Sequence, residues 1–573
     1  MGHFIGVWDL SGSLQWQDLA TSLEAATVRL GGRTTSFDND RGIVKCVEFH
    51  GSDASHVLSP DRAVTLAVGD PLHPGRQVPT PKGSVEALHD DLRDSGFDRL
   101  ARLRGQFAAC HVDPDFGRLV LIGDRLGIRP VFLWRTGSIV AFSTSFSALL
   151  NLRDGPVTAV PESVWEIMAL GYALEDRTLS ADVELLPVGT ALVAGRSVQF
   201  RKIYPDLQAG ILVEATDDEL VEELDARFTD AVRIRTMGSQ GQRQLSFLSG
   251  GLDSRAIVSK LVQLGERVTT VNVAPPGTLD AELGERAASR LGTRHRHFDM
   301  RKVRGRLSTL MRIATQEVWA EEESIPSSRG VWSGQGGSLI IGGLDLTQTI
   351  LDLAVSRQWD PMARHLLNEL GAAIPLRLVG RDHRERAGPD LVETVASVLK
   401  ASGSSRAPAE SPHLFLLGSQ VRRSLHSYYS QSGPGDYEPI LPFFDSEFGD
   451  WIVQVPVERK LNHRLYHRWL LSGALSPAEE VPWQTYPGHE PCPLPLPNEL
   501  PDQWSSRSAW YPERMQRKIG RSTALQAVRG MRGGIFPSSQ LDMRYATFAI
   551  AASLIGFSRW RYVPEVLARL ALR

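Results

Sequence analysis

The pattern of apolar and polar positions changes near residue 217. Before that point, short apolar runs stand between Gly, Asp and Pro residues, as at Leu119–Ile122, Val131–Trp134 and Ile139–Phe142. Short apolar runs bounded by turn residues are typical of β-strands. Residues 1–205 are therefore predicted to form a β-rich domain of hairpins or sandwich strands.

After that point, apolar positions recur at helical spacing, and Asp217 is the expected helix cap. The apolar positions of this first helix are 220, 221, 224, 228 and 232. Strands and helices then alternate, with a strand at 245–248, a helix at 254–264, a strand at 268–273 and a helix at 280–291. This order predicts a parallel α/β sheet within residues 215–573, followed from about residue 350 by a helix-rich extension.

Two segments follow neither pattern. Ser402–Ser411 reads SGSSRAPAES and is predicted to be a flexible loop. Tyr486–Pro501 reads YPGHEPCPLPLPNELP, which contains too much proline for a helix or a sheet. It is predicted to be an extended surface segment.

Composition narrows the class of protein. The chain has 573 residues, 42% hydrophobic and 23% charged, as in soluble globular proteins of two or three domains. The net charge of -3 gives no basic surplus for nucleic acid, and no apolar run is long enough to cross a membrane. Cys46, Cys110 and Cys492 are far apart, with neither metal spacing nor a disulfide framework. Since no secretion signal is read either, a cytoplasmic protein is expected.

One glycine-rich stretch carries candidate chemistry. It reads SGGLDS and joins the predicted strand at 245–248 to the predicted helix at 254–264. Glycines let backbone amides approach an anion, and the N-terminus of a helix points positive character at it. The stretch therefore predicts a phosphate site made of Ser249, Gly250, Gly251, Leu252, Asp253 and Ser254.

Asp253 adds a second expectation. A carboxylate in this loop would repel phosphate unless a cation lay between them, so Asp253 suggests a Mg²⁺ ligand. The loop differs from the lysine-containing loop of common nucleoside triphosphatases, because no lysine follows it. The alternative interpretation is a tight strand–helix turn with a capping serine.

The SGGLDS stretch resembles the pyrophosphate loop of the ATP-pyrophosphatases, and most closely that of asparagine synthetase and its relatives. Further stretches resemble successive parts of the same family: Gly123–Trp134 with Ile139–Leu150, then Leu279–Met300, then Glu438–Pro456. The resemblance implies an Ntn-type glutaminase-like β-rich sandwich domain before an adenine nucleotide alpha hydrolase-like parallel sheet. It also implies ATP and Mg²⁺, and a carboxylate that attacks the α-phosphate before an amine displaces AMP.

The chain departs from the family at its start. A working glutaminase domain has a nucleophilic cysteine directly after the initiator methionine, whereas Gly2 follows Met1 here and the nearest cysteine is Cys46. Release of ammonia from glutamine therefore has no expected nucleophile. The amine is expected to come from elsewhere.

A second departure concerns the family's second pyrophosphate motif, S-G-x-G-x-D-E. One register matches Ser333–Gly336 to it and leaves no acid. The other takes Leu339–Ile341 as the preceding strand and 342–345 as the loop, with Gly343 at the pyrophosphate and Asp345 as the second metal ligand. The second register is preferred, because a strand must precede the loop and an acid must complete the Mg²⁺ site. Alternatively, Asp345 only caps the following helix.

The third departure is a missing lysine. The resemblance implies a lysine near 481–491 that stabilises the adenylate, and that segment contains none. Lys460, Arg464 or Arg468 could substitute for it, and Lys460 is taken as the candidate.

The family's catalytic glutamate is matched by Glu438, which could orient or deprotonate the incoming amine. Its alternative role is an ion pair with Arg422 or Arg423. Asp445 is interpreted as structural.

Relatives that lack the cysteine use the substrate's own amine, and they include β-lactam synthetases and lasso peptide cyclases. The chain looks more like the cyclases, which join a peptide's N-terminal amine to an Asp or Glu side chain. This resemblance implies a precursor core peptide as substrate, with a leader-binding protein and a leader peptidase as partners. A β-lactam synthetase, an ammonia-using asparagine synthetase and an inactive scaffold stay as alternatives.

Overall fold

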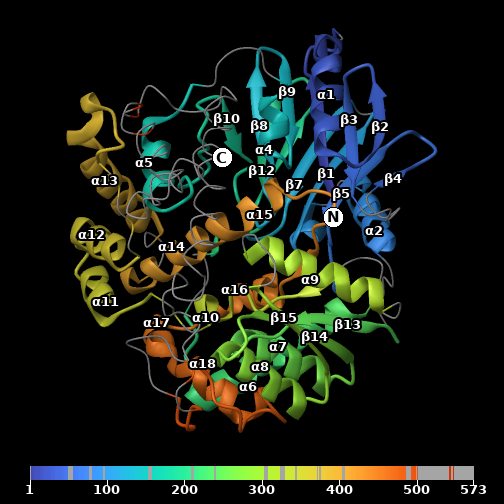
Figure 1. Ribbon diagram of the computed structural model, residues 1–573. Coiled ribbons are helices and arrows are strands. Elements are labelled where there is room, and N and C mark those ends of the chain that lie inside the picture. The colour runs from blue at the N-terminus through green and yellow to red at the C-terminus, as the bar shows by residue number, and fades with distance from the viewer. Residues whose placement is uncertain are drawn as a thin grey trace.

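The computed structural model describes most of the chain up to residue 497. The described residues are 2–13, 15–49, 56–75, 81–94, 97–115, 117–152, 158–207, 212–237, 241–301, 307–322, 330–341, 343, 345–370, 372, 374, 376–402, 407–484, 492–497, 500, 541, 543 and 546. The antiparallel sheets lie in the upper part of Figure 1, the parallel sheet in the lower part and helices α11–α13 at one side.

Among its described residues, the N-terminal part contains two six-stranded sheets, ordered β10-β8-β9-β1-β3-β2 and β12-β11-β7-β6-β5-β4. The strands are β1 (Gly2–Asp9), β2 (Arg33–Asn39), β3 (Gly42–Glu48), β4 (His56–Leu58), β5 (Val64–Gly69), β6 (Phe107–Asp113), β7 (Arg118–Gly123), β8 (Phe132–Thr136), β9 (Ile139–Ser143), β10 (Val183–Leu185), β11 (Thr190–Ala194) and β12 (Val198–Lys202). The three strands that the apolar runs predict are confirmed as β7, β8 and β9.

These sheets form the middle of a four-layer sandwich. In β1, Phe4 and Trp8 are buried between the sheets, whereas Ile5 and Val7 face helices, as the two-residue period of a strand requires. The covering helices are α1 (Ala20–Leu30), α4 (Phe146–Leu150) and α5 (Pro161–Ala169) on one sheet, and α2 (Pro81–Arg93) and α3 (Phe97–Leu100) on the other. The expected β-rich Ntn-type sandwich is confirmed.

The second sheet system is parallel, with the order β15-β14-β13-β16-β17. Its strands are β13 (Arg243–Phe247), β14 (Arg267–Ala274), β15 (Arg294–Asp299), β16 (Gly330–Trp332) and β17 (Glu438–Ile440). Helices α6 (Asp217–Thr236), α7 (Leu252–Gln263) and α8 (Leu279–Arg290) share one core, and α9 (Leu307–Glu321) belongs to another. The predicted alternation of strands and helices is confirmed.

The expected cap of α6 is wrong by one residue. Thr216 is the N-cap, because its hydroxyl accepts a hydrogen bond from the Glu219 amide at 3.3 Å while the Glu219 carboxylate accepts one from the Thr216 amide at 2.8 Å. This reciprocal capping box satisfies two amides of the first turn. Asp217 is the first helical residue and instead pairs with Arg459 and Arg468.

The helix-rich extension is also confirmed. It comprises α10 (Gly337–Ile340), α11 (Gln348–Val355), α12 (Trp359–Glu369), α13 (Arg384–Ser402), α14 (Ser411–Gln420), α15 (Ser427–Ser430), α16 (Ser446–Ile452), α17 (Val457–Lys460) and α18 (Arg464–Trp469). Within the predicted loop at 402–411, a short 3-10 turn forms at Pro408–Glu410, and 403–406 lie outside the described residues. Of the predicted extended segment, 492–497 form neither helix nor strand, and 486–491 lie outside the described residues.

Aromatic packing holds α18 against the rest of the second domain. The ring of Phe228 on α6 stacks on Phe443 with centroids 4.6 Å apart, and it meets Trp469 of α18 edge-on at 5.1 Å. Such pairs contribute roughly 0.5–1.5 kcal/mol each beyond the area they bury. The position of α18 relative to α6 is thereby fixed.

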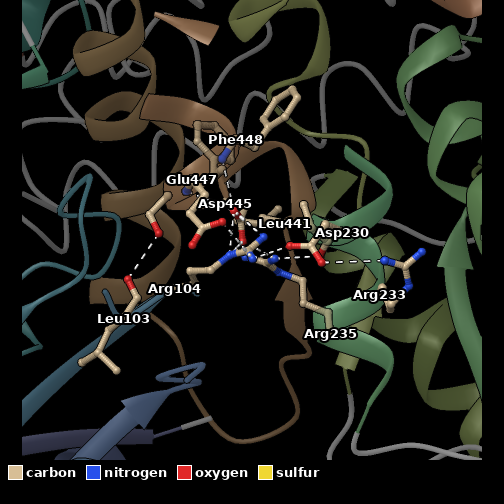
Figure 2. Close-up of polar contacts among 12 residues, drawn as sticks. Leu103, Arg104, Asp230, Arg233, Arg235, Leu441, Asp445, Glu447 and Phe448 are labelled. Carbon is tan, nitrogen blue, oxygen red and sulfur yellow. Dashed lines mark hydrogen bonds and ion pairs between the residues drawn. The ribbon is translucent and has the colours of Figure 1, made fainter. Parts of the chain in front are cut away.

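The two parts of the chain meet at a buried ion cluster (Figure 2). Asp445 is 0% exposed and accepts hydrogen bonds from Arg104 of the N-terminal part at 2.9 Å and from Arg235 of α6 at 2.7 Å. Its Oδ1 also caps α16 by accepting from the amides of Glu447 and Phe448. Burial acts to raise the pKa of Asp445, but the two guanidinium charges outweigh it and hold that pKa below its ordinary value. Asp445 is structural, as the sequence suggests.

Further contacts fasten the same segment. Arg125 donates to Asp450 at 2.8 Å, and the Gln106 side chain donates to the carbonyls of Leu441 and Phe444. The stretch Glu438–Pro456 therefore holds the antiparallel sandwich against the β17 edge of the parallel sheet. No helix in the described part of the chain is long and apolar enough to cross a membrane.

Candidate active site

A cavity of about 320 Å³ opens where β13 and β14 end. The carboxyl ends of parallel strands are where α/β sheets bind ligands. Its wall is built from the loop after β13, the end of β14, the loop after β16, the start of α18 and the pair Trp483–Gln484. The SGGLDS stretch thus lies at the place in the fold that suits a ligand.

The SGGLDS loop is closed by its own serines. The Ser249 amide donates to the Ser254 hydroxyl at 3.0 Å, and the Gly251 amide donates to the Ser249 hydroxyl at 3.2 Å. Gly251 is the N-cap of α7, so the amides of the first turn of α7 point toward the loop. The predicted strand–loop–helix arrangement is present.

Five of the six loop residues line the cavity, namely Ser249, Gly251, Leu252, Asp253 and Ser254. Gly250 is the exception. Its amide donates to Asp280 at 2.7 Å, and a Cβ there would lie 3.0 Å from the Asp280 Cα. Gly250 therefore allows the loop to pack against α8 rather than facing the cavity.

Asp253 is the central charged group of the site. Its Oδ1 accepts hydrogen bonds from the Tyr466 hydroxyl at 2.5 Å and the Ser338 hydroxyl at 2.8 Å. Burial raises its pKa, and these hydrogen bonds offset only part of that rise. Asp280 also lines the cavity, and burial raises its pKa in the same way. A cation bound beside such a carboxylate would offset the free-energy cost of burying its charge.

The second glycine-rich loop follows β16. The prediction that Leu339–Ile341 is the strand before the second pyrophosphate motif is therefore wrong. Those residues are not a strand, because α10 spans Gly337–Ile340. A short apolar run cannot be assigned to strand or buried helix by periodicity alone, and the true strand, Gly330–Trp332, has three residues. The register through Ser333–Gly336 is the one that follows a strand.

Close packing explains the glycines of this second loop. A Cβ on Gly334 would lie 2.5 Å from the Ser254 amide nitrogen, and one on Gly337 would lie 2.8 Å from the Asp253 carboxyl carbon. Ser338 stands where the motif S-G-x-G-x-D-E has its first acid, and it donates to Asp253. The two loops therefore meet at Asp253.

The other second-motif candidates lie elsewhere. Neither Gly343 nor Asp345 lines the cavity. Gly343 has φ of 64° and packs against the Lys460 carbonyl, and Asp345 has φ of 65°. Asp345 is not the helix cap either, since Thr347 caps α11 by accepting from the Ile350 amide. The structure does not bring Asp345 and Asp253 together in the cavity.

Lys460 does not reach the cavity. It is 0% exposed, and its ammonium donates to the Ile452 carbonyl at 3.0 Å and lies 3.1 Å from His413 Nδ1. Burial, reinforced by the Lys460 charge, lowers the pKa of His413 well below its ordinary value, so His413 is a neutral acceptor. Arg464 is exposed and Arg468 pairs with the first turn of α6, and neither lines the cavity.

Glu438 lies at the first position of β17 and is also absent from the cavity wall. Its carboxylate pairs with Arg129, whose guanidinium stacks over the Tyr429 ring at 4.1 Å. The side chains of Arg422 and Arg423 lie outside the described set. Among the described side chains, one partner of Glu438 is therefore an arginine of the N-terminal part, which no local spacing indicated.

Sequence reasoning missed one wall of the cavity. It is formed by His463, Tyr466 and His467 with Trp483 and Gln484. These residues are more than two hundred positions from the SGGLDS loop in sequence, as the separation of 213 between Asp253 and Tyr466 shows. The only local sign of a site in the sequence was the helical spacing of three ring side chains, His463, Tyr466 and His467. The same spacing is common in hydrophobic cores, so it did not identify a site.

Comparison with known proteins supports a two-part organisation. Residues 78–204 match the family model described as a glutamine amidotransferase domain, and residues 223–327 match the model described as asparagine synthase. The second match contains the SGGLDS loop. The part of the chain that carries this loop is therefore similar to asparagine synthase.

Individual relatives are similar at low identity. A carboxyethyl-arginine β-lactam-synthase of Streptomyces clavuligerus is 24% identical over 424 residues, covering 70% of this chain and 68% of that protein. The glutamine-hydrolysing asparagine synthetase 1 of Bacillus subtilis is 21% identical over 323 residues, covering 53% of this chain and 49% of that protein. The chain thus spans about two thirds of the first relative and about half of the second.

Proposed function

We propose that this chain is an AMP-forming, ATP-dependent amide ligase, and that it is a lasso peptide cyclase. The observation that carries the ligase is the meeting of two glycine-rich loops at one half-buried carboxylate, that of Asp253. Ser249, Gly251 and Ser254 of the first loop line the same cavity as Ser333 and Gly334 of the second. Helix N-termini, loop amides and hydroxyls of this kind suit a pyrophosphate group.

The proposed reaction has two steps. A carboxylate oxygen of the substrate attacks the α-phosphorus of ATP, the bond to the bridging oxygen breaks, and pyrophosphate leaves. An amine nitrogen then attacks the acyl carbon of the adenylate, the bond to AMP breaks, and the amine loses a proton to solvent. The loop donors stabilise the charge that moves onto pyrophosphate in the first step.

The donor set fits Mg²⁺ that arrives with the nucleotide. No group of three His, Cys, Asp or Glu side chains able to hold a metal occurs in the described part of the chain. Mg²⁺ is commonly held by one or two carboxylates together with substrate phosphates, and Asp253 offers such a carboxylate. When bound, Mg²⁺ would neutralise phosphate charge. The Asp253 carboxylate would hold the ion, and the Tyr466 and Ser338 hydroxyls would orient that carboxylate.

The cysteines of the N-terminal part argue that the amine does not come from glutamine. Cys46 and Cys110 are both 0% exposed, and burial raises the pKa of the Cys110 thiol well above its ordinary value. Gly2 lies in β1, where a Cβ would collide with the Val47 carbonyl. Both thiols are buried out of reach of a glutamine substrate, which supports a reaction with an amine from another source.

We propose a precursor core peptide as the substrate. Its Asp or Glu side chain would be adenylated, and its N-terminal amine would close the macrolactam. A leader-binding protein and a leader peptidase would be transient cytoplasmic partners. This finer assignment rests on the burial of Cys46 and Cys110 and on resemblance to cyclases that act on a peptide's own amine.

The similarity to the β-lactam-synthase favours one alternative, in which a small amino acid closes a four-membered ring. An ammonia-using asparagine synthetase-like ligase is the related possibility. Incubation with ATP, Mg²⁺ and either a linear core peptide or small amino acids separates them. The proposal expects pyrophosphate release and loss of one water only with the peptide; release with small amino acids alone would overturn the cyclase.

A further inference from the structure

The cavity has an uneven charge distribution. Among the described residues that line it, there is no lysine and no arginine, while Asp253 and Asp280 supply two carboxyl groups. Within the same described lining, His463 and His467 are the side chains able to carry a positive charge. A site that binds a triphosphate needs hydrogen-bond donors that can also carry positive charge. His463 and His467 are therefore the candidates for this role in the described lining.

The backbone is bent to place His463 in the wall. Asn462 and His463 have φ of 53° and 61°, so two successive residues other than glycine are left-handed. Such conformations cost roughly 1–3 kcal/mol each and gather at ligand sites, where surrounding structure holds them. This bend separates α17 from α18. Lys460 before it points to His413 and Ile452, whereas His463 after it lines the cavity and is 4% exposed.

The two imidazoles form one unit with the carboxylate loop. Their rings stack with centroids 5.6 Å apart and planes 24° apart, and the ring of Trp483 lies 5.7 Å from that of His467. Tyr466, between them in sequence, donates its hydroxyl proton to Asp253 at 2.5 Å. The stack is therefore anchored to the SGGLDS loop.

The position of the stack indicates the phosphate end of the nucleotide. β14 and β16 flank β13 on opposite sides. The β14 side of the cavity carries the apolar side chains of Val271 and Val273 of β14 and Met311 of α9. It also carries the amide of Asn272 and the carboxyl group of Asp280, which would repel phosphate. On the β16 side, the Asp253 carboxylate accepts hydrogen bonds from Ser338, which follows β16, and from Tyr466 of α18. His463 and His467 flank Tyr466 in sequence, so they lie on this side of the cavity.

We infer that His463 and His467 bind the phosphates of ATP through their imidazole N–H groups. In this proposal they stabilise the negative charge of the nucleotide, as the resemblance implies for a lysine. Lys460 cannot do so, because it does not reach the cavity. The inference rests on the proposed function, because it assumes that ATP occupies this cavity. His463 and His467 are accordingly phosphate-binding residues of this chain.

Calorimetric titration with adenosine, AMP, ADP and ATP in the presence of Mg²⁺ tests this assignment. The variants are His463→Gln, His467→Gln and the double change, with His467→Lys as a rescue. His365→Gln is the control, because His365 on α12 pairs with Glu369 and does not line the cavity. Thermal unfolding confirms that each variant is folded, and the half-buried His467→Gln carries the test if the double variant does not fold.

The expected result is a loss that grows with the number of phosphates. Hydrogen bonds to charged groups correspond to about tenfold to a hundredfold in affinity, so ATP should weaken by that factor while adenosine is unchanged. His467→Lys should recover most of the ATP affinity. Equal losses of affinity for adenosine and ATP, or no loss of affinity, would overturn this inference but leave the proposed function standing. A wild-type protein that binds no nucleotide would overturn the proposed function as well.

Discussion

The chemistry at the residue scale centres on the Asp253 carboxylate. It is half-buried, its pKa is raised, and two hydroxyl groups from separate elements orient it. Keeping a buried charge costs free energy unless a partner compensates for it. We propose that a cation bound together with its nucleotide is that partner.

Replacing the charge without changing the shape tests this role. Asp253→Asn should reduce the rate of pyrophosphate release by about a hundredfold or more, the scale of losing one preorganised charge contact. The control is Asp382→Asn, because Asp382 is exposed and does not line the cavity. Turnover of Asp253→Asn at the rate of the control would remove Asp253 from the site.

Single residues also show the limit of sequence reasoning here. Asp253 could be identified because its loop is contiguous. Ser338 and Tyr466, which hold its carboxylate, are 85 and 213 residues away in sequence, and neither is a residue type that marks a site. The preference for Asp345 arose from requiring a second acid, whereas a serine occupies that position of the motif.

At the scale of elements, two glycine-rich loops are packed directly onto each other. Gly334 lies against the backbone of 253–254, and Gly336, with φ of 99°, lies against the Phe444 ring. Short strands precede both loops. Sequence reasoning located the first loop, whose strand of five residues has a clear pattern, and misplaced the second, whose strand has three.

Gly334→Ala should therefore disable the site. Its new methyl group would lie 2.5 Å from the Ser254 amide nitrogen, a contact that forces the loops apart. We expect a drop of about tenfold or more in ATP affinity and a loss of roughly 1–3 kcal/mol in stability.

Gly388→Ala is the matched control. Gly388 lies within α13, where an added Cβ would meet no heavy atom within 4 Å, and the change should gain up to about 1 kcal/mol from reduced chain entropy. Calorimetric ATP titration and urea unfolding measure both variants. Normal ATP binding by Gly334→Ala would show that the contact between the loops does not shape the site.

The whole molecule depends on contacts that join its two parts. Arg104 and Asp445 are 341 residues apart and meet in the buried cluster of Figure 2. The sequence predicted the sandwich, the parallel sheet and the helical extension, because periodicity reports local structure. Cross-domain partners such as Arg129 for Glu438 could not be predicted, since no local pattern encodes them.

Asp445→Ala should destabilise the protein strongly. The change leaves Arg104 and Arg235 buried without their shared carboxylate, which typically costs about 3–5 kcal/mol. Urea unfolding measures it. Glu447→Ala is the control, because the Glu447 side chain is 53% exposed and should matter little. Equal stability of the two variants would mean that the cluster does not hold the domains.

The same carboxylate predicts a pH dependence. Because the pKa of Asp445 is lower in the folded protein than in the unfolded chain, the folded state binds fewer protons there. Its stabilising contribution is complete above the ordinary aspartate pKa of about 4 and is lost as pH falls below that value. Urea unfolding from pH 7 down to pH 3 should therefore show a steeper acid loss for the wild type than for Asp445→Ala. Parallel pH profiles would argue against this role for Asp445.

The nucleotide products distinguish the proposed AMP-forming chemistry from reactions that form ADP, and the mass of the peptide reports the new amide bond. Purified protein is incubated with ATP, Mg²⁺ and its linear core peptide, and nucleotides and peptide mass are measured together. We predict AMP and pyrophosphate in equal amounts, with a peptide lighter by one water. Formation of ADP and phosphate, or unchanged ATP with its genuine peptide, would contradict the proposal.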